Sequence, residues 1–403
     1  MSRWHKSHSS AFLFFICSHQ SARVFARLSA LIIKDRVISN QQPTTLIDVV
    51  SHDLRRGRGA LSNTTGRFEA QARHAFDDGW DSLGDLDVFK TDVQEDATRS
   101  IITRNDSPDI SFDRSINPYR GCEHGCIYCY ARPSHCYLGH SAGLDFETKL
   151  YAKSNAAALL EQELAAKNYT PATIALGSNT DPYQPIERER HITRGILEVL
   201  ARTQHPVGIV TKSALVVRDI DILGTMAEKE LVRVAISITT LDRTVARTME
   251  PRAATPAKRL DAVRQLSAAG IPVTVMVAPV VPGLTDHEIE TILEAAYEAG
   301  ARDAGYVLLR LPHEIKQLFR EWLSEAFPDR AGRVISLLQS MHGGKDYVAA
   351  FGHRQRGGGP YADQIALRFK LARQRLGMTG ERKSLRKDLF RKPVLPGGQL
   401  ALF

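Results

Sequence analysis

The sequence lacks a long apolar run. Its nearest candidate, residues 11–17, is far shorter than the roughly 18 consecutive apolar residues that a membrane-spanning helix requires. This argues against a protein that crosses a membrane, and we expect no membrane partner.

Cysteine is also scarce. The 403 residues include five cysteines, and three of them, Cys122, Cys126 and Cys129, lie within eight residues of one another. An odd, clustered set is not the disulfide framework of a secreted protein. It is typical of a metal site in a reducing compartment, so we expect a cytoplasmic location.

Acidic residues are outnumbered. The chain has 45 Asp and Glu against 53 Lys and Arg, a net charge of +8, which favours an anionic partner, with nucleic acid first. The first 34 residues contain no acidic residue but five basic ones. We expect residues 1–50 to be a disordered extension, which is either a targeting segment or the product of a start codon assigned too early.

Regular periodicity begins only after residue 110. Residues 51–110 hold polar and charged clusters and are predicted to be poorly structured, with the Gly-Arg-rich piece at 55–59 as a solvated linker. Short β-branched runs then predict strands at 111–117, 172–177, 207–211, 232–239, 272–278 and 305–309. Amphipathic stretches predict helices between them, at 154–167, 189–203, 217–229, 255–269 and 286–299.

This alternation predicts an α/β fold with a parallel sheet and crossover helices. Six such units predict a partial (β/α)6 TIM-type barrel over residues 111–312, with the site at the carboxyl ends of its strands. A helical C-terminal part follows at 313–378, with helices at 313–327, 330–341 and 361–375, and then a basic flexible tail at 379–403. Residues 368–392 hold ten Lys or Arg, which fit either a solvated face or a phosphate-binding surface.

The three clustered cysteines have the spacing C-x3-C-x2-C. Thiolates select iron–sulfur clusters, zinc or Cu(I). Three thiolates on one tight loop can bind three irons of a cubane and leave the fourth iron without a protein ligand. Gly121 and Gly125 allow the backbone to turn sharply around such a cluster.

Two other interpretations of the cysteines stay open. A structural zinc site requires a fourth ligand, which Cys136, His124 or His135 would have to supply. Buried thiols without any metal are the other interpretation, although Glu, His and Gly residues surround them.

The cysteine segment resembles the radical S-adenosylmethionine superfamily. Its motif is C-x3-C-x-aromatic-C, and Tyr128 stands in the aromatic position. The runs at 117–132, 180–187, 211–213 and 250–252 are similar to the branch that contains spore photoproduct lyase, and the resemblance covers about 111–375.

The resemblance implies a [4Fe-4S] cluster on Cys122, Cys126 and Cys129, with S-adenosyl-L-methionine bound at the open iron. One electron then breaks the sulfonium bond, and the resulting 5′-deoxyadenosyl radical abstracts hydrogen from a substrate. The resemblance also implies an electron donor such as flavodoxin or ferredoxin.

Polar residues at predicted strand ends are the candidates for binding this cofactor. They are Ser178, Asn179, Asp181, Lys212, Ser237 and Thr239. Asp181 suits an ammonium or ribose group, or else a turn before Pro182, and Lys212 suits a carboxylate or else the surface. Thr239 equally fits simple strand propensity. Glu250 and Arg252 are expected to form an ion pair near the site.

One departure from the branch concerns the hydrogen donor to the product radical. Spore photoproduct lyase uses a cysteine at the end of the second strand, whereas this chain has Ser178 there and no thiol from 177 to 181. A hydroxyl group is a much poorer hydrogen-atom donor, so thymine-dimer cleavage by that route is not expected. Ser178 and Tyr183 are the candidate catalytic residues.

The chain ends Gln-Leu-Ala-Leu-Phe, from Gln399 to Phe403. This pentapeptide resembles the motif that docks bacterial proteins on the replication sliding clamp, and its alternative is a tail packed on its own domain. The leading hypothesis is therefore a radical enzyme that acts on nucleic acid, in DNA repair or modification. The alternatives are a radical enzyme for a protein or small molecule, and a non-enzymatic metal-binding module.

Overall fold

The computed structural model describes residues 50–69, 88–378 and 384–395, all within one compact unit, Ile47–Phe403. Almost all of the expected N-terminal extension and the whole 399–403 motif lie outside these residues. None of the helices described is both long and apolar enough to cross a membrane.

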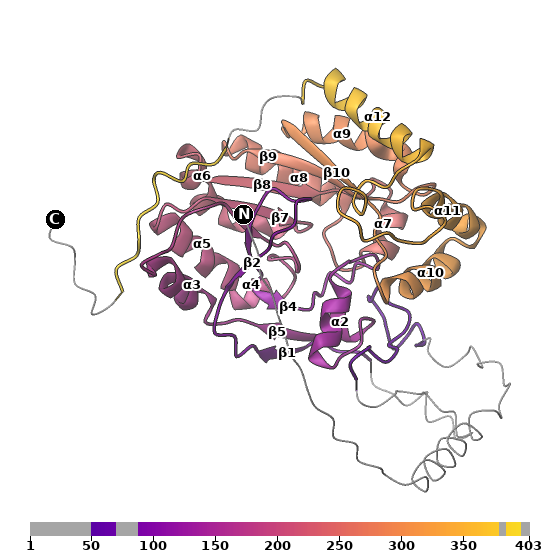
Figure 1. Ribbon diagram of the computed structural model, residues 1–403, viewed down its shortest axis with the longest axis horizontal. Helices are drawn as coiled ribbons and strands as arrows, with labels where there is room; N and C mark the ends of the chain where they lie inside the picture. The colour runs from indigo at the N-terminus through magenta and orange to yellow at the C-terminus, as the bar shows by residue number, and fades with distance from the viewer. Residues whose placement is uncertain (1–49, 70–87, 379–383, 396–403) are drawn as a thin grey trace, which may run out of the picture. The chain divides into compact units, whose positions relative to one another are not determined.

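The main sheet has seven strands in the order β10-β9-β8-β7-β6-β3-β2 (Figure 1). They are β2 (Ile102–Arg104), β3 (Arg114–Ile116), β6 (Ile174–Leu176), β7 (Val207–Thr211), β8 (Val232–Ser237), β9 (Val273–Val280) and β10 (Asp303–Leu308). The last six run parallel and follow chain order, and β2 joins the edge antiparallel to β3. All six predicted strands are confirmed, and the α/β class with them. The sheet has two edges, β10 and β2, and does not close.

Crossover helices connect the parallel strands as predicted. The long ones are α3 (Ala156–Ala165), α5 (Ile192–Arg202), α6 (Ile220–Glu228), α8 (Pro256–Ala268) and α9 (Ile289–Glu298). Shorter turns precede several of them: α4 (Glu187–Arg190), η3 (Ala214–Asp219), α7 (Arg243–Met249) and η4 (Asp286–Glu288). The helices exist because apolar residues recur on one face, as Ile289, Ile292 and Leu293 do in α9, all fully buried.

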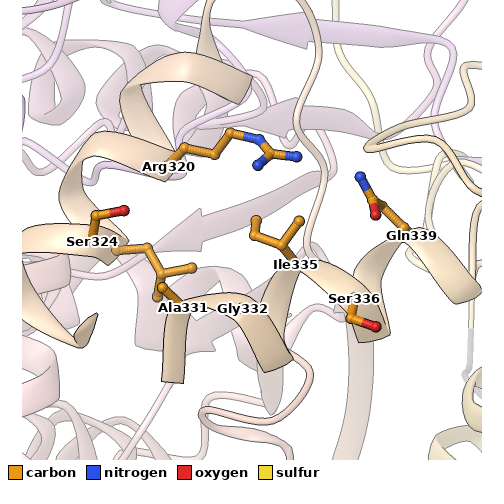
Figure 2. Close-up of a pocket in the computed structure, with 8 residues that line it drawn as sticks. Arg320, Ser324, Ala331, Gly332, Ile335, Ser336 and Gln339 are labelled. Carbon is orange, nitrogen blue, oxygen red and sulfur yellow. The ribbon is translucent and has the colours of Figure 1, made fainter. Parts of the chain in front are cut away.

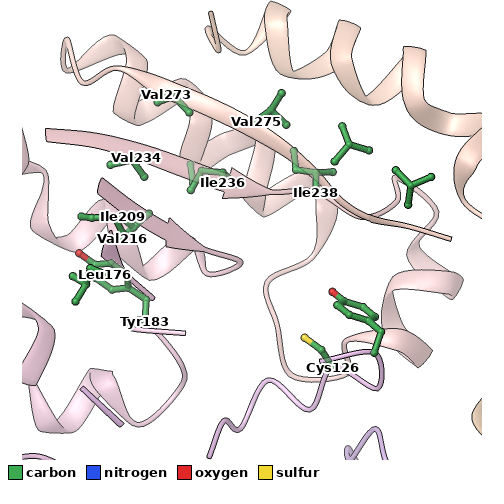
Figure 3. Close-up of a cluster of buried hydrophobic side chains, with 14 of the residues drawn as sticks. Cys126, Leu176, Tyr183, Ile209, Val216, Val234, Ile236, Ile238, Val273 and Val275 are labelled. Carbon is green, nitrogen blue, oxygen red and sulfur yellow. The ribbon is translucent and has the colours of Figure 1, made fainter. Parts of the chain in front are cut away.

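The core of the main sheet is built from β-branched and leucine side chains. Figure 3 shows Leu176, Ile209, Val234, Ile236 and Val275 on neighbouring strands, and each is at most 1% exposed. Residues that are buried on both faces of a parallel sheet read as nearly continuous apolar runs, which is why these strands were predictable.

A second, small sheet was not predicted. It consists of β1 (Asp92–Glu95), β5 (Lys149–Ala152) and β4 (Tyr119–Arg120), in the order β1-β5-β4. The 3-10 helix η2 (Arg132–Leu138) and the short helix α2 (Asp145–Thr148) lie between β4 and β5 in the chain, and Figure 1 shows α2 next to β5. β1 and β2 belong to the segment predicted to be poorly structured. Both are short and polar; β1 is defined by pairing with the distant β5, and β2 by pairing with the nearby β3.

In the Gly-Arg-rich piece, Arg55, Arg58 and Gly59 are buried and only Arg56 and Gly57 are exposed, so its prediction as a solvated linker is wrong. Arg58 Nη1 donates to the Glu147 backbone oxygen (2.9 Å), and the Gly59 and Ala60 N–H groups donate to the Glu147 carboxylate (2.9 Å each). A side chain at Gly59 would clash with the Gly125 carbonyl. Here glycine allows close backbone approach and arginine serves an internal hydrogen-bond network.

The C-terminal helices occur as predicted: α10 (Ile315–Ala326), α11 (Pro328–Ser340) and α12 (Pro360–Arg375). Figure 1 shows α12 beside α9, and Arg368 forms an ion pair with Glu290 (2.6 Å) across this contact.

Residues 384–395, the described part of the predicted flexible tail, lie against the domain. The Arg391 N–H donates to the Thr203 carbonyl (2.9 Å), and the Phe390 ring packs on His205 (5.3 Å between centroids). Phe390 is an apolar residue within a basic run, and its packing explains why this segment lies against the domain. The number of charged residues alone did not predict this contact.

Candidate functional site

The cysteine loop, residues 121–132, follows β4 and is fixed by backbone hydrogen bonds to helices α2 and α7. The Cys122 N–H donates to Phe146 O (2.9 Å) on the small-sheet side, and the Ile127 N–H donates to Met249 O (3.0 Å), which follows β8. Gly121 has φ +75°, and a Cβ there would lie 2.6 Å from Leu150 Cδ2. The predicted sharp turn is therefore present, and only glycine fits it.

Arg132 holds the cysteine loop from within. Its side chain is fully buried and forms an ion pair with the fully buried carboxylate of Glu147 (2.5 Å). Its other contacts are the carbonyl oxygens of Gly125 (3.1 Å), Cys126 (2.9 Å), Ala142 (3.1 Å) and Gly143 (2.9 Å). Sequence reasoning assigned no role to Arg132 or Glu147, because their pairing depends on the folded loop.

The three thiols are free and lie largely out of water. Cys122 and Cys126 are 7% and 8% exposed, and Cys129 is partly exposed. Burial raises the pKa of the Cys126 thiol to about 12, and the nearby Glu250 carboxylate acts in the same direction. Thiolates at such a place require a bound metal to offset their charge, so the donor set suits metal ligation.

The arrangement fits a cubane better than a single ion. Within residues 50–69, 88–378 and 384–395, no three His, Cys, Asp or Glu side chains gather closely enough to hold one metal ion. Three free thiols on one loop are instead the kind of ligand set that an iron–sulfur cluster uses.

The possible fourth ligands for zinc have other partners. His124 Nδ1 faces Asp181 Oδ2 (3.4 Å), and His135 Nε2 donates to the Lys149 carbonyl (2.8 Å). The Cys136 sulfur accepts from the Arg67 N–H. Each of the three candidate fourth ligands is therefore already in contact with another described residue, which disfavours the zinc interpretation.

Asp181 connects the ends of β6 and β7. Its carboxylate accepts from the Tyr183 N–H (2.9 Å), the Thr211 hydroxyl (2.7 Å) and the Lys212 N–H (2.7 Å). Burial alone would raise its pKa, but His124 and these donors hold the pKa at about 2. Both carboxylate oxygens thus accept from protein donors, so the side chain serves to order the site. The backbone N–H of Asp181 donates to the Cys122 sulfur.

Ser178 and Asn179 are organised by Asn117. Asn117 Nδ2 donates to Ser178 Oγ (3.3 Å), and its Oδ1 accepts from the Asn179 N–H (2.8 Å). The Ser178 carbonyl accepts from the Tyr130 hydroxyl. The second strand end therefore sits directly beside the residue that follows Cys129.

Lys212 has a free ammonium group at the end of β7. Its Nζ lies 5.6 Å from the centroid of the Tyr128 ring, within the cysteine loop. No hydrogen bond or ion pair of Nζ is found with any residue that the structure describes. A cation without a protein partner beside the thiols is available for a ligand carboxylate.

Thr239 and Ser237 contact a buried ion pair that sequence reasoning missed. Glu250 pairs with Arg259, and both side chains are 1% exposed. Thr239 Oγ1 donates to Glu250 Oε1 (2.7 Å), and Arg259 Nη1 donates to the Ser237 carbonyl (3.1 Å). The Tyr128 hydroxyl also donates to Glu250.

The predicted Glu250–Arg252 ion pair is wrong. Arg252 instead pairs with Glu123 (3.1 Å), and the Glu250 carboxylate is turned into the protein toward Arg259. Residues two apart after a helix point in different directions, so adjacency in sequence did not give the partner.

Tyr183 lies in the core. Figure 3 shows its ring beside Leu176, Ile209 and Val216, with its hydroxyl directed away from Cys126. It is fully buried. Of the two candidate catalytic residues, Ser178 contacts the cysteine loop through the Tyr130 hydroxyl, whereas the Tyr183 ring packs into the core.

Tyr130 marks the exposed side of the cysteine loop. It is 46% exposed, and the Arg310 guanidinium lies 4.9 Å from its ring centroid. Lys212 and Arg354 are also near enough to act on the charge of its phenol. Arg354 is partly neutralised by Asp109.

A cavity of about 320 Å³ elsewhere has no link to these groups. Figure 2 shows it between α10 and α11, lined by Arg320, Ile335 and Gln339 among others. Arg320 is paired with Asp346 (2.7 Å). No residue of the cysteine loop or of the strand ends contributes to it.

The family model of the radical SAM superfamily matches residues 116–296, which span the cysteine loop and the strand ends described above. This part of the chain belongs to the radical SAM superfamily.

Two relatives by sequence are described as uncharacterized proteins. A protein of Mycobacterium tuberculosis (strain ATCC 25618 / H37Rv) is 38% identical over 226 residues, which cover 56% of this chain and 66% of that protein. A protein of Methanocaldococcus jannaschii is 30% identical over 173 residues, covering 43% and 62%. The chain thus spans somewhat less than two thirds of the length of these relatives.

Solved structures of spore photoproduct lyase share the fold. A mutant with dinucleoside spore photoproduct aligns with a TM-score of 0.51 at 15% identity, covering 70% of this chain and 78% of that one. The lyase complexed with dinucleoside spore photoproduct gives 0.50 at 16% identity, with the same coverage. The predicted similarity to this branch is confirmed at the level of fold.

Proposed function

We propose that the chain is a radical S-adenosylmethionine enzyme in which Cys122, Cys126 and Cys129 hold a [4Fe-4S] cluster. The observation that carries the proposal is the cysteine loop, with three free thiols at the carboxyl edge of a parallel sheet and the unpaired Lys212 ammonium beside them. We also propose that residues 111–312 form a partial (β/α)6 TIM-type barrel, because their six parallel strands in chain order support it.

When bound, such a cluster supplies one electron to the sulfonium of S-adenosylmethionine and thereby a 5′-deoxyadenosyl radical. The chain's own residues would bind and orient the cofactor. Lys212 would hold its carboxylate, and Asn117, which orders Ser178 and the Asn179 backbone, would shape the strand end beside it. Asp181 would act by ordering this edge and donating its N–H to Cys122.

The test begins with anaerobic reconstitution of the full chain with iron and sulfide, followed by dithionite and S-adenosylmethionine. We expect about four irons per chain and release of 5′-deoxyadenosine. Cys126→Ala is expected to abolish both, whereas the matched thiol variant Cys136→Ala keeps both. Bound zinc without 5′-deoxyadenosine release would overturn the proposal in favour of a non-enzymatic metal module.

We further propose that the substrate is nucleic acid, in DNA repair or modification. The net charge of +8 and the cations near Tyr130 support an anionic substrate. The fold similarity to spore photoproduct lyase, solved with a dinucleoside photoproduct, points the same way. Thymine-dimer cleavage through a thiol hydrogen donor is not part of the proposal. The strand end carries the hydroxyl of Ser178 instead of a thiol, and the Cys136 sulfur accepts a hydrogen bond from the Arg67 N–H.

Binding to single- and double-stranded DNA as a function of salt tests this substrate class. Phosphate contacts predict an affinity that falls steeply with salt. A DNA affinity that does not change with salt would favour a protein or small-molecule substrate. So would a rate of 5′-deoxyadenosine formation that is the same with and without DNA. The basic segment 368–392 contributes less than its composition suggests, because Arg368, Arg373 and Arg375 are ion-paired.

Docking on a bacterial sliding clamp through Gln399 to Phe403 is a separate proposal, since these residues lie outside those described. Deleting 399–403 is expected to abolish clamp capture in a pull-down and to leave cluster reconstitution unchanged. Clamp capture that survives the deletion would contradict it.

A further inference from the structure

A cavity of about 260 Å³ opens beside the first part of the cysteine loop. His124, which stands between Cys122 and Cys126 in the chain, forms part of its wall. The segments that follow β6, β7 and α7 supply the rest, including Pro185, Arg188 of α4, Leu215, Arg252 and Lys258 of α8.

The wall of this cavity is cationic. Arg188, Arg252 and Lys258 are all exposed, and no carboxylate lines the cavity. Arg252 is partly neutralised by the buried Glu123 (3.1 Å). The side chains of Arg188 and Lys258 have no hydrogen bond or ion pair to any described residue, so two positive charges are left to act on a partner.

A short chain of contacts leads from this cavity to a thiol. The His124 ring is 2% exposed, and its Nδ1 lies 3.4 Å from Asp181 Oδ2. The Asp181 N–H in turn donates to the Cys122 sulfur. Tyr130 and the cations around it do not line the cavity, so the chain offers separate places for a substrate and for a second partner.

We propose that this cavity is the docking surface for a small acidic one-electron carrier protein that reduces the cluster. The inference rests on the proposed function, because only a chain that holds a reducible cluster needs such a partner. One electron leaves the carrier's reduced flavin or iron–sulfur group, which is oxidised by one electron, and the cluster is reduced by one electron.

The size and charge of the surface suit this kind of encounter. Weak electron-transfer complexes bury less than about 1,200 Å² in total, so a small cationic recess is sufficient. A wall of one charge sign steers an oppositely charged protein and raises its association rate. The path through His124 and Asp181 then brings the carrier close to Cys122.

The test compares Lys258→Glu with Lys370→Glu, an identical charge change on exposed residues of two helices. Lys258 is the third residue of α8, and its N–H donates to the N-cap Thr255. Glutamate there completes a capping box, so the helix is retained. Arg188→Glu is a second variant at the cavity.

The first measurement is the affinity of the full-length, iron-free chain for flavodoxin. Lys258→Glu and Arg188→Glu are expected to weaken binding about tenfold at low salt, with a smaller difference at high salt. Lys370→Glu is expected to bind like the unmodified chain. Equal affinities for all four proteins would overturn the docking surface.

The second measurement is the rate of cluster reduction after reconstitution. Reduced flavodoxin is expected to reduce Lys258→Glu about tenfold more slowly than the unmodified chain, whereas dithionite reduces both equally. Loss of DNA affinity in Lys258→Glu with unchanged flavodoxin binding would assign the cavity to nucleic acid and overturn the inference. Failure of dithionite to reduce any cluster would overturn the proposed function itself, whatever flavodoxin binding shows.

Discussion

The main sheet and the small sheet support the same cysteine loop by different means. The main sheet is filled by apolar residues such as Ile209, Val234 and Val275, and polar groups gather only where its strands end. The small-sheet side is joined to the loop through the buried Arg132–Glu147 ion pair and its backbone hydrogen bonds. One side rests on non-directional burial and the other on directional contacts.

The difference matters for a metal site. Apolar packing tolerates exchange among side chains of similar volume, so it fixes the sheet without fixing each loop atom. Hydrogen bonds from Arg132 to the loop carbonyls of Gly125 and Cys126, and to those of Ala142 and Gly143 outside the loop, fix the backbone on which the thiols stand. The small-sheet side should therefore be far more sensitive to single polar substitutions.

Arg132→Met is expected to have the largest effect. It leaves the fully buried Glu147 carboxylate without its counter-charge and removes donors from the loop carbonyls. Loss of one partner of a buried ion pair costs about 3–5 kcal/mol in the free energy of unfolding. Urea unfolding of the metal-free chain measures this loss.

Arg320→Met is the matched control. Arg320 also binds a carboxylate, Asp346, but its side chain is 43% exposed. An exposed ion pair contributes less than about 1 kcal/mol. Losses of equal size in the two variants would remove the distinction drawn for the small sheet.

His135 predicts an acid sensitivity on the small-sheet side. Burial, which leaves Nδ1 without a partner, lowers its pKa to about 4, although the hydrogen bond from Nε2 to the Lys149 carbonyl acts in the opposite direction. The unfolded chain takes up this proton near its ordinary pKa of 6.5, whereas the folded chain does so only near 4. Stability therefore falls as the pH drops through this window, by about 3 kcal/mol.

His135→Gln keeps a donor for the Lys149 carbonyl and removes the titrating group. We expect the slope of unfolding free energy against pH, between about 6.5 and 4, to lose the equivalent of one proton. His205, buried beside Phe390 with its pKa lowered to about 4, provides the comparison on the main-sheet side. An unchanged slope in His135→Gln would show that this ring is already accessible to protons.

The two sheets also differ in how far the sequence predicted them. Each parallel strand of the main sheet is a local apolar run between helices, so the sequence alone predicts its position. The spacing of the three cysteines likewise predicts where the site lies. β1, β4 and residues 55–59 have polar sequences whose order comes from partners such as Glu147, far along the chain. For the same reason Arg132, Arg259 and the true partner of Glu250 were missed, although Lys212 and Ser178 were placed beside the loop.

Thr239→Val separates a structural role from cofactor binding. The change keeps the side-chain volume but removes the hydroxyl that donates to Glu250 (2.7 Å). A hydrogen bond to a buried charged group is worth about 2 kcal/mol, and we expect that loss of stability with unchanged S-adenosylmethionine affinity. Ser237→Ala is the control, because the carbonyl of Ser237, which the variant retains, binds Arg259. A weaker affinity for S-adenosylmethionine without a loss of stability would instead show that Thr239 binds the cofactor.

Lys212→Met is expected to change stability least and ligand binding most. Its ammonium has no hydrogen bond or ion pair with the part of the chain that the structure describes, so its removal breaks no internal pair and the unfolding free energy should stay within about 0.5 kcal/mol. A charge-assisted contact to a carboxylate is worth about 1.5–3 kcal/mol, so affinity for S-adenosylmethionine should fall about 10- to 100-fold. Calorimetric titration of the reconstituted chain measures this, with Lys370→Met, on the exposed face of α12, as the control. A large loss of stability with unchanged affinity would mean that Lys212, like Arg132, serves the fold.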